Sequence, residues 1–182
     1  MDLAAPFEGT LLIPEKILAG DSPVTLDTGE TVAQIRRPFF AVRHAFDILD
    51  APGGTVGHGG AVGFFRRRWP VRRAGGTVLL EFTVAWTGPS GRSRILLNTG
   101  AELSLKGSWW MSRSFTVHHG DDLVAEIQPT THAMSLRNDT YAFSLRTPLL
   151  SVIAAVGLAQ SIRNEVQASR NRAHQNTIHH HT

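Results

Sequence analysis

The most basic segment of the chain is the run from Arg66 to Arg73, in which five arginines surround one tryptophan. Guanidinium groups bind phosphate oxygens in a bidentate way, and tryptophan favours the headgroup level of a membrane. An alternative interpretation is an exposed loop or edge strand whose charges oppose sheet-to-sheet aggregation. No nucleic-acid-binding motif accompanies the run, so we expect no nucleic-acid partner. The candidate contacts to an anionic headgroup are Arg66, Arg67, Arg68, Trp69, Arg72 and Arg73.

The segment from His118 to Asp122 carries two imidazoles and two carboxylates, the side chains of a metal site. Adjacent residues of a strand point to opposite faces, however, so His118 and His119 would diverge. The segment also lies between two apolar stretches, as the tip of a hairpin does. We therefore predict a plain turn and no metal or other cofactor.

Hydrolase chemistry is a further possibility, because Ser112, Ser114 and His132 supply hydroxyls and an imidazole, and His118 is a second candidate base. The sequence has no Gly-x-Ser-x-Gly elbow to present a serine nucleophile. A catalytic serine also needs an oriented base and oxyanion donors. We expect that the chain is not an enzyme.

Two other features favour structure over chemistry. The segment Gly57-His58-Gly59-Gly60 lacks the Lys-Ser/Thr ending of a phosphate-binding loop, and we predict a flexible turn there. The adjacent Trp109 and Trp110, with Trp86 and Trp69, could form a ligand platform. Alternation along a strand turns one of the adjacent pair inward, which favours a place in the core.

The elements that must position these residues are strands for most of the chain, from residue 10 to about residue 146. Short segments rich in β-branched and aromatic residues alternate with glycine-containing turns. Three units repeat the order of apolar strand, polar glycine turn and second strand, which is the pattern of a β-hairpin. These units span residues 24–32, 46–56 and 115–124.

The C-terminal part of the chain has a different pattern. Thr147 suits the N-cap of a helix and Pro148 its first position, which predicts a helix over 148–167. From Leu149 to Ala159 apolar residues cover every face, and a helix of that kind is buried. We expect it to reach the surface near Ser161 and residues 168–182 to form a flexible tail.

Several hairpins followed by one apolar helix predict a mainly β fold, an antiparallel barrel that encloses the C-terminal helix. Closure of the sheet also removes its unpaired edges. We expect a single domain over residues 10–167, preceded by an N-terminal arm at residues 1–9.

At this level the chain resembles the tubby C-terminal-like superfamily, in particular its LURP-one-related and phospholipid-scramblase-like branch. The resemblance covers residues 10 to about 163, and the order of the motifs before the apolar helix carries it. The matching segments are Leu26–Val32, Phe46–Asp50, Gly107–Trp110 leading into Phe115–Val117, Leu123–Ile127 and Asp139–Leu145.

The resemblance implies a barrel of about twelve strands around a central helix. Tubby proteins bind phosphoinositides through basic residues, and scramblases are linked to lipid movement and calcium. This sequence has no acidic calcium loop, no cysteine-rich palmitoylation stretch and no recognisable phosphoinositide motif, so neither activity transfers residue by residue. LURP-one-related members imply no settled biochemical role.

Composition agrees with a folded domain and narrows its chemistry. The 182 residues are 42% hydrophobic and 18% charged, with a net charge of +3. Since there is no cysteine, disulfides, thiolate nucleophiles and cysteine-based zinc sites are excluded. The apolar stretch 149–159 is too short to span a bilayer. We expect a monomer in the cytoplasm, peripheral to a membrane.

The leading hypothesis is therefore a non-enzymatic barrel domain that binds anionic phospholipid headgroups at a membrane surface. The main alternative is a structural or protein-interaction module with a protein partner and no lipid ligand. The least favoured hypothesis is a hydrolase or metal-dependent enzyme.

Overall fold

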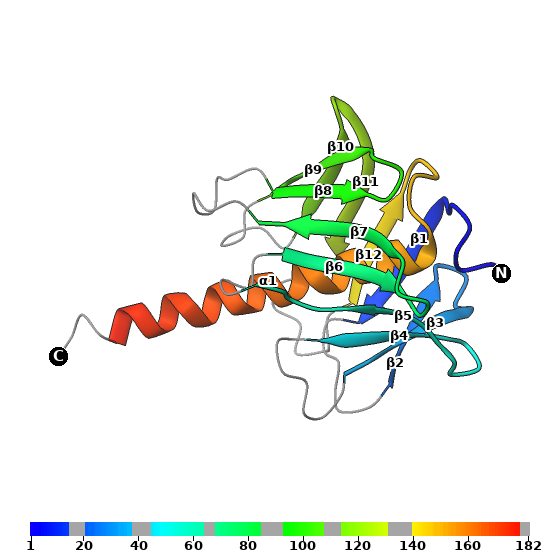
Figure 1. Cartoon of the computed structure of the whole chain (residues 1–182), viewed down its shortest axis with the longest axis horizontal. Helices are drawn as coiled ribbons and strands as arrows, with labels where there is room; N and C mark the ends of the chain where they lie inside the picture. Colours follow the sequence, from blue (N-terminus) through cyan, green and yellow to red (C-terminus); the bar gives the residue numbers. More distant parts are fainter. Residues whose placement is uncertain are drawn as a thin grey trace.

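A computed structural model describes residues 1–14, 21–37, 45–63, 68–84, 93–107, 114–130 and 140–178, with side chains up to residue 168. In it the chain forms twelve strands followed by one helix, shown in Figure 1. The strands are β1 (Gly9–Pro14), β2 (Asp21–Leu26), β3 (Thr31–Arg36), β4 (Phe46–Asp50), β5 (Thr55–Gly59), β6 (Arg68–Arg73), β7 (Val78–Thr83), β8 (Ser93–Leu97), β9 (Glu102–Lys106), β10 (Phe115–His119), β11 (Asp122–Pro129) and β12 (Thr140–Leu145). The helix is α1 (Val152–Ile178).

The strands form one closed antiparallel barrel in which each strand pairs with the next along the chain. The barrel closes between β12 and β1, which pair from Gly9 opposite Leu145 to Pro14 opposite Thr140. This arrangement confirms the predicted fold class, a mainly β barrel with one C-terminal helix. The three predicted hairpins are β2–β3, β4–β5 and β10–β11.

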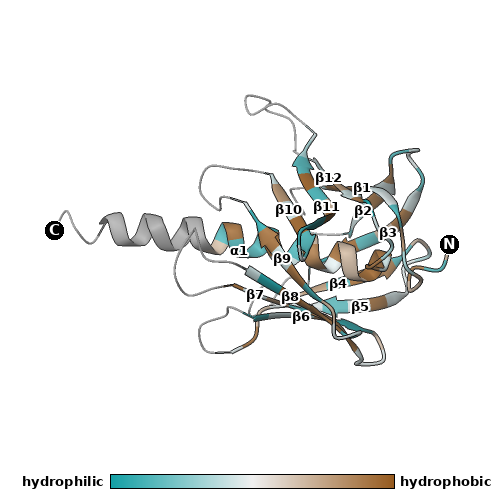
Figure 2. Ribbon diagram, turned by 90° about the horizontal axis from the view of Figure 1, so that it is seen from above, coloured by the Kyte–Doolittle hydropathy of each residue, from teal (hydrophilic) through white to brown (hydrophobic). Residues whose placement is uncertain are grey.

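Alternation along the strands separates the core from the outer surface. In β8, for example, Ser93, Ile95 and Leu97 are buried while Arg94 and Leu96 are exposed. Figure 2 shows the same alternation of apolar and hydrophilic residues in neighbouring strands. Period-two patterning of this kind is what fills the inside of a small barrel with side chains.

One end of the barrel, here called the turn end, carries the short connections at residues 27–30, 51–54, 74–77, 98–101 and 120–121. Four of these turns share one hydrogen-bond scheme, in which the last strand residue accepts from the N–H three positions later. The donor in each case is a glycine with positive φ, a conformation that other residues rarely adopt. These glycines are Gly29, Gly53, Gly76 and Gly100.

The helix also begins at the turn end, later than expected. Its first residue is Val152, and Ser151 caps it, since Ser151 Oγ accepts a hydrogen bond of 3.2 Å from the Ala154 N–H. The prediction of Thr147 as cap and Pro148 as first helical residue was therefore wrong. The physical reason is that Leu150 and Ser151 pair with the N-terminal arm: Phe7 N–H donates to Leu150 O at 2.9 Å.

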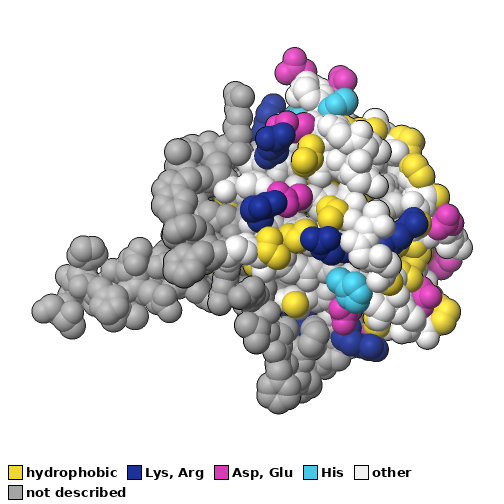
Figure 3. Space-filling model, viewed as in Figure 1, with side chains coloured by type: hydrophobic (Ala, Val, Ile, Leu, Met, Phe, Trp, Pro, Cys, Tyr) yellow, Lys and Arg dark blue, Asp and Glu magenta, His cyan; other side chains and the backbone are white. Residues whose placement is uncertain are grey.

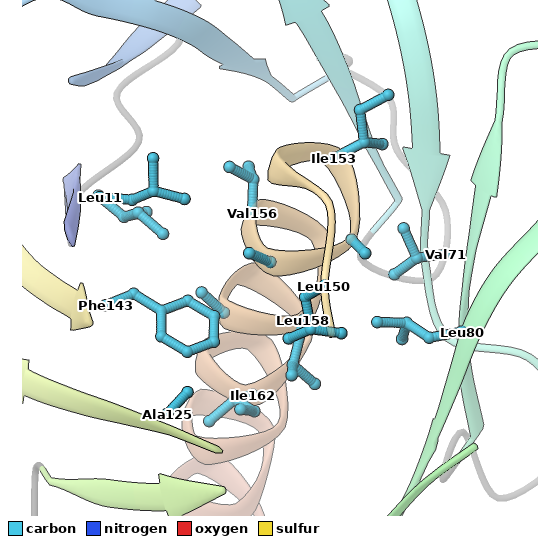
Figure 4. Packing of buried hydrophobic residues seen from close by; sticks show 14 of the residues in the cluster. Leu11, Val71, Leu80, Ala125, Phe143, Leu150, Ile153, Val156, Leu158 and Ile162 are labelled. Carbon is cyan, nitrogen blue, oxygen red and sulfur yellow. The ribbon is translucent and has the colours of Figure 1, made fainter. Parts of the chain in front are cut away.

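The barrel encloses the N-terminal half of α1, as the apolar pattern predicts. Figure 4 shows Ile153, Val156, Leu158 and Ile162 of the helix among side chains from strands on opposite sides of the barrel. These four residues are between 0% and 3% exposed. The strand residues labelled around them are Leu11, Val71, Leu80, Ala125 and Phe143.

The helix packs most closely against the wall formed by β4 to β7. A Cβ atom on Gly157 would lie 2.4 Å from Cγ1 of Val71, and one on Gly57 would lie 2.7 Å from Cγ2 of Ile153. Gly57 and Gly59 belong to β5, so the prediction of a flexible turn at residues 57–60 was wrong. These glycines instead allow the helix and the Phe46 ring to approach the backbone closely.

The helix stays buried beyond the point where the sequence suggested an exit. Ser161 and Asn164 are fully buried and Glu165 is 2% exposed, which corrects the expected emergence near Ser161. The helix then continues to Ile178, so most of the expected tail at 168–182 has a helical backbone. Figure 1 shows this C-terminal half projecting from the end opposite the turn end. No helix formed by the described residues combines the length and apolar character needed to cross a membrane.

Candidate functional site

Strand β6 carries four of the six predicted headgroup contacts, and it separates them. Arg68 begins the strand at the end of the barrel from which α1 projects. Arg72 and Arg73 are its last residues, at the turn end. At about 3.3 Å per residue, Arg68 and Arg73 lie roughly 17 Å apart along the strand. Arg66 and Arg67 lie outside the described residues. The described arginines of the run therefore do not converge on one ligand.

Arg68 is occupied by a carboxylate of the next strand. Its Nη2 and Nε donate to the two carboxylate oxygens of Glu81 at 2.5 and 3.0 Å. This bidentate bond raises the pKa of Arg68 above its ordinary value. The arrangement is that of a cross-strand surface ion pair, which neutralises the charge locally.

Trp69 lies inside the barrel, which corrects its prediction as a headgroup contact. Its side chain is 1% exposed and belongs to the apolar core. The indole Nε1–H donates to Oε2 of Glu165 on the helix at 3.2 Å. Since an indole in the core has a single donor, this bond satisfies it and ties β6 to α1.

Glu165 belongs to a layer of buried polar side chains that sequence reasoning missed. The Gln160 side-chain amide donates to Asn164 Oδ1 at 2.9 Å, and Arg37 Nη2 donates to the same oxygen. Burial lowers the pKa of Arg37. In the sequence, polar residues at the end of the apolar stretch predict that the helix reaches the surface there. In the structure these side chains are buried, and hydrogen bonds inside the barrel satisfy them.

Arg72 and Arg73 are both exposed and occupy the last two positions of β6. The pairing register with β7 shifts between Val71 and Arg72. The extra residue is Leu79 of β7, which falls between the partners of Val71 and Arg72, whereas β6 keeps a regular register with β5 up to Arg73. Both arginines directly precede the turn Ala74-Gly75-Gly76, where the strand ends.

The two arginines also differ from the other exposed arginines in their pairing. Among the side chains that the structure describes, neither Arg72 nor Arg73 has a carboxylate partner; Arg72 Nη1 donates only to the carbonyl of Gly76 at 3.3 Å. Figure 3 shows the usual situation on this face, with basic and acidic side chains interspersed. The paired arginines are Arg36 with Asp21, Arg68 with Glu81, Arg94 with Glu102 and Arg146 with Glu126.

The turns beside Arg72 and Arg73 carry no acidic residue. They are Ala74-Gly75-Gly76-Thr77 and Asn98-Thr99-Gly100-Ala101. Acidic residues at the turn end lie on the other turns, in the N-terminal arm and directly after the turn 98–101, where Glu102 pairs with Arg94. They are Asp2, Glu8, Asp27, Glu30, Asp50, Glu102, Asp121 and Asp122. We call Arg72, Arg73 and the turns 74–77 and 98–101 the arginine sector. Its two guanidinium groups have no carboxylate partner among the described side chains, unlike the paired arginines of the barrel wall.

The remaining candidates form no comparable group. His118 and His119 end β10 at the tip of a hairpin, as predicted, and His118 Nε2 bonds Thr116 Oγ1 at 3.1 Å. Within the described ranges no three His, Cys, Asp or Glu side chains are placed to hold a metal ion. Ser114 lies just before β10. The predictions for Ser112, His132, Trp86, Trp109 and Trp110 fall outside the described residues.

Comparison with known proteins identifies a solved structure with a similar fold and the family to which the chain belongs. A solved X-ray structure of an Arabidopsis thaliana protein matches with a TM-score of 0.60 at 19% identity, over 91% of this chain and 94% of that one. At that identity the likeness concerns the fold. The comparison with curated proteins found no match. The LURP-one-related family model matches residues 10–148, most of the chain, which therefore belongs to the LURP-one-related family.

Proposed function

We propose that this LURP-one-related domain is a non-enzymatic binding module that attaches to anionic phospholipid headgroups through the arginine sector. The observation that carries the proposal is the difference in pairing. Four exposed arginines of the barrel wall are neutralised by carboxylates, whereas Arg72 and Arg73 at the turn end are not. A guanidinium without an internal partner keeps its donors for an external oxyanion.

The expected attachment is weak and electrostatic. A basic residue near an anionic membrane contributes about 1 kcal/mol, so Arg72 and Arg73 together contribute about 2 kcal/mol. Salt screens such contacts, and binding should fall as ionic strength rises. The cytoplasmic leaflet carries the anionic lipids, and the proposed location is therefore the cytoplasmic surface of a membrane.

The non-enzymatic part of the proposal is supported by how the described histidines are placed. His58 Nδ1 bonds Asp47 Oδ1 at 2.7 Å across β4 and β5, and both side chains lie on the exposed outer face. His118 bonds the hydroxyl of Thr116 on β10. Base–carboxylate and base–hydroxyl pairs thus occur on different strands, whereas nucleophilic catalysis needs the three groups in one chain of hydrogen bonds.

The test is co-sedimentation with phosphatidylcholine vesicles that contain or lack phosphatidylserine, at low and physiological salt. The wild-type chain should bind only the acidic vesicles and less tightly at the higher salt. The double variant Arg72→Ser/Arg73→Ser should bind roughly 25-fold more weakly, the equivalent of about 2 kcal/mol.

The matched control is Arg94→Ser/Arg146→Ser, which removes two arginines that already have carboxylate partners. It should weaken binding much less than the sector variant. Equal losses in the two variants would reduce the sector to bulk charge and contradict the proposal. Binding that ignores lipid charge would contradict the proposal, and the absence of binding to either kind of vesicle would favour the protein-interaction alternative.

A further inference from the structure

A cleft of about 260 Å³ opens at the turn end between the start of α1, the N-terminal arm and the strands β6 to β8. Its rim carries polar side chains from three places along the chain: Arg73 and Thr77, Asn98 and Thr99, and Ser151. Its floor is apolar, with Leu97 and Leu150 buried below the surface. A polar rim over an apolar floor is the usual composition of a small-molecule site.

The rim of the cleft carries side chains that can donate hydrogen bonds to a ligand. Arg73 has no carboxylate partner among the described side chains, and it is the one charged residue among those that line the cleft. The hydroxyl oxygens of Thr99 and Ser151 accept from backbone N–H groups at 3.5 and 3.2 Å. Since each oxygen is used as an acceptor, each O–H remains a donor.

The backbone N–H groups of residues 153–155, in the first turn of the helix, do not add to this set. Ile153 N–H donates to Leu3 O at 3.2 Å, and the N–H groups of Ala154 and Ala155 donate to Oγ and O of Ser151. The recognition chemistry of the cleft therefore rests on its side chains. One guanidinium and two or three neutral donors suit a single negative charge spread over several oxygens.

Size and polarity restrict the ligand further. The cleft volume of about 260 Å³ is below the range of about 300–1,000 Å³ that holds drug-sized molecules, so it fits a headgroup-sized part of one. Leu149 lines the same cleft and is 40% exposed, which offers an apolar contact next to the charged rim. An anion with an apolar stem would satisfy both parts.

We propose that this cleft binds the phosphodiester group of an anionic phospholipid, with the Arg73 guanidinium and the Thr99 and Ser151 hydroxyls donating to its oxygens. A phosphodiester carries one negative charge, which matches the single cation of the rim. The inference rests on the proposed function and adds to it one stoichiometric site with a defined ligand. Within the arginine sector it distinguishes Arg73, which lines the cleft, from Arg72, which does not.

That distinction provides a matched pair of variants. Arg72 and Arg73 are adjacent, exposed and equally charged. Attraction by net charge alone predicts the same loss for Arg72→Gln and Arg73→Gln. The cleft predicts that Arg73→Gln weakens binding of a soluble short-chain lipid about tenfold, as expected for a lost charge-assisted hydrogen bond, and that Arg72→Gln weakens it less than twofold. Thr99→Val, at an exposed turn position, removes one hydroxyl and should weaken binding about threefold.

The measurement is a titration of the full chain followed by two-dimensional amide NMR, with three probes. They are dihexanoyl phosphatidylglycerol, glycerophosphoglycerol without acyl chains, and inorganic phosphate. The expected order of affinity is the short-chain lipid first, the bare headgroup second and phosphate last. Amide shifts should centre on residues 73, 77, 98, 99 and 151.

The possible outcomes distinguish failure of the cleft proposal from failure of the proposed membrane function. Vesicle binding by the wild-type chain, together with equal effects of Arg72→Gln and Arg73→Gln on short-chain lipid binding, would overturn the cleft and leave the proposed function standing. Short-chain lipid binding that depends on Arg73, without vesicle binding, would support the cleft and contradict the membrane function. Phosphate binding as tight as that of the short-chain lipid would identify a small-anion site and overturn the lipid assignment.

Discussion

Replacing Gly157 with alanine should destabilise the fold, the opposite of the usual effect inside a helix. Gly157 is buried where α1 crosses β6. A Cβ atom there would lie 2.4 and 2.7 Å from the two Cγ atoms of Val71, distances that real Cβ contacts do not show. Val71 is itself fully buried, and the close packing of a protein core limits how far such a side chain can move.

The expected change in the free energy of unfolding for Gly157→Ala follows from two opposing effects. Alanine is better than glycine in a helix interior by about 1 kcal/mol. Overpacking of a filled core costs about 1–3 kcal/mol. The net result is a free energy of unfolding lower by about 1 kcal/mol, or a Tm lower by about 2–4 °C for a chain of this size.

A double-mutant cycle isolates the contact. Val71→Ala alone removes both Cγ atoms and should cost about 2 kcal/mol as a core truncation. In that background Gly157→Ala has room for its methyl group and should be neutral or stabilising, so the two changes couple favourably by about 1–2 kcal/mol. Urea unfolding followed by near-UV circular dichroism gives all four free energies of unfolding.

Gly75→Ala is the control, because a Cβ atom at Gly75 would meet nothing within 4 Å. It should change stability by less than about 0.5 kcal/mol. If Gly157→Ala instead raised the free energy of unfolding, or showed no coupling to Val71→Ala, the close contact between helix and β6 would be refuted.

Three further changes test other parts of the fold. Trp69→Phe removes the one indole donor to the buried Glu165 carboxylate and should lower the free energy of unfolding by about 1–3 kcal/mol in a urea titration. The hydrogen bond from Arg36 holds the pKa of Asp21 below its ordinary value of 3.8, so the stability from this pair is present above that value and is lost as pH falls through the folded-state pKa. Arg36→Gln should return the pKa of Asp21 towards 3.8 in an NMR titration, and an unchanged pKa would contradict the pairing. Truncation after Thr147 removes the helix that fills the barrel and should give an insoluble or molten product by near-UV circular dichroism; a soluble fragment that melts cooperatively would contradict the enclosed helix.

The hairpins were predictable because their turns are encoded locally. A four-residue segment is enough to predict the turn in two of them, Leu26-Asp-Thr-Gly29 and the corresponding residues 50–53. The same signal exists at Arg73-Ala-Gly-Gly76 and Leu97-Asn-Thr-Gly100, the turns of the hairpins β6–β7 and β8–β9. The positive-φ glycines at 29, 53, 76 and 100 recur at intervals of 24, 23 and 24 residues, and that periodicity could have identified both hairpins.

The site was less predictable because it depends on contacts between distant parts of the chain. Alternation alone would have turned Trp69 inward beside an outward Arg68, but its partner Glu165 lies 96 positions away. Alternation from Val71 would turn Arg73 inward, whereas Arg72 and Arg73 are both exposed where the strand ends. The carboxylate on β7 that neutralises Arg68 likewise becomes visible only when the strand register is known.

The most direct test of the proposed function uses the fact that the chain has no cysteine. A single cysteine at Gly75, in the arginine sector, and one at Thr28, on the acidic β2–β3 turn, can each carry an environment-sensitive fluorophore. Both positions are exposed turn residues at the same end of the barrel. On vesicles containing phosphatidylserine, the label at position 75 should move to a less polar environment while the label at position 28 stays in water. Equal response of the two labels, or a response only at position 28, would contradict attachment through the arginine sector.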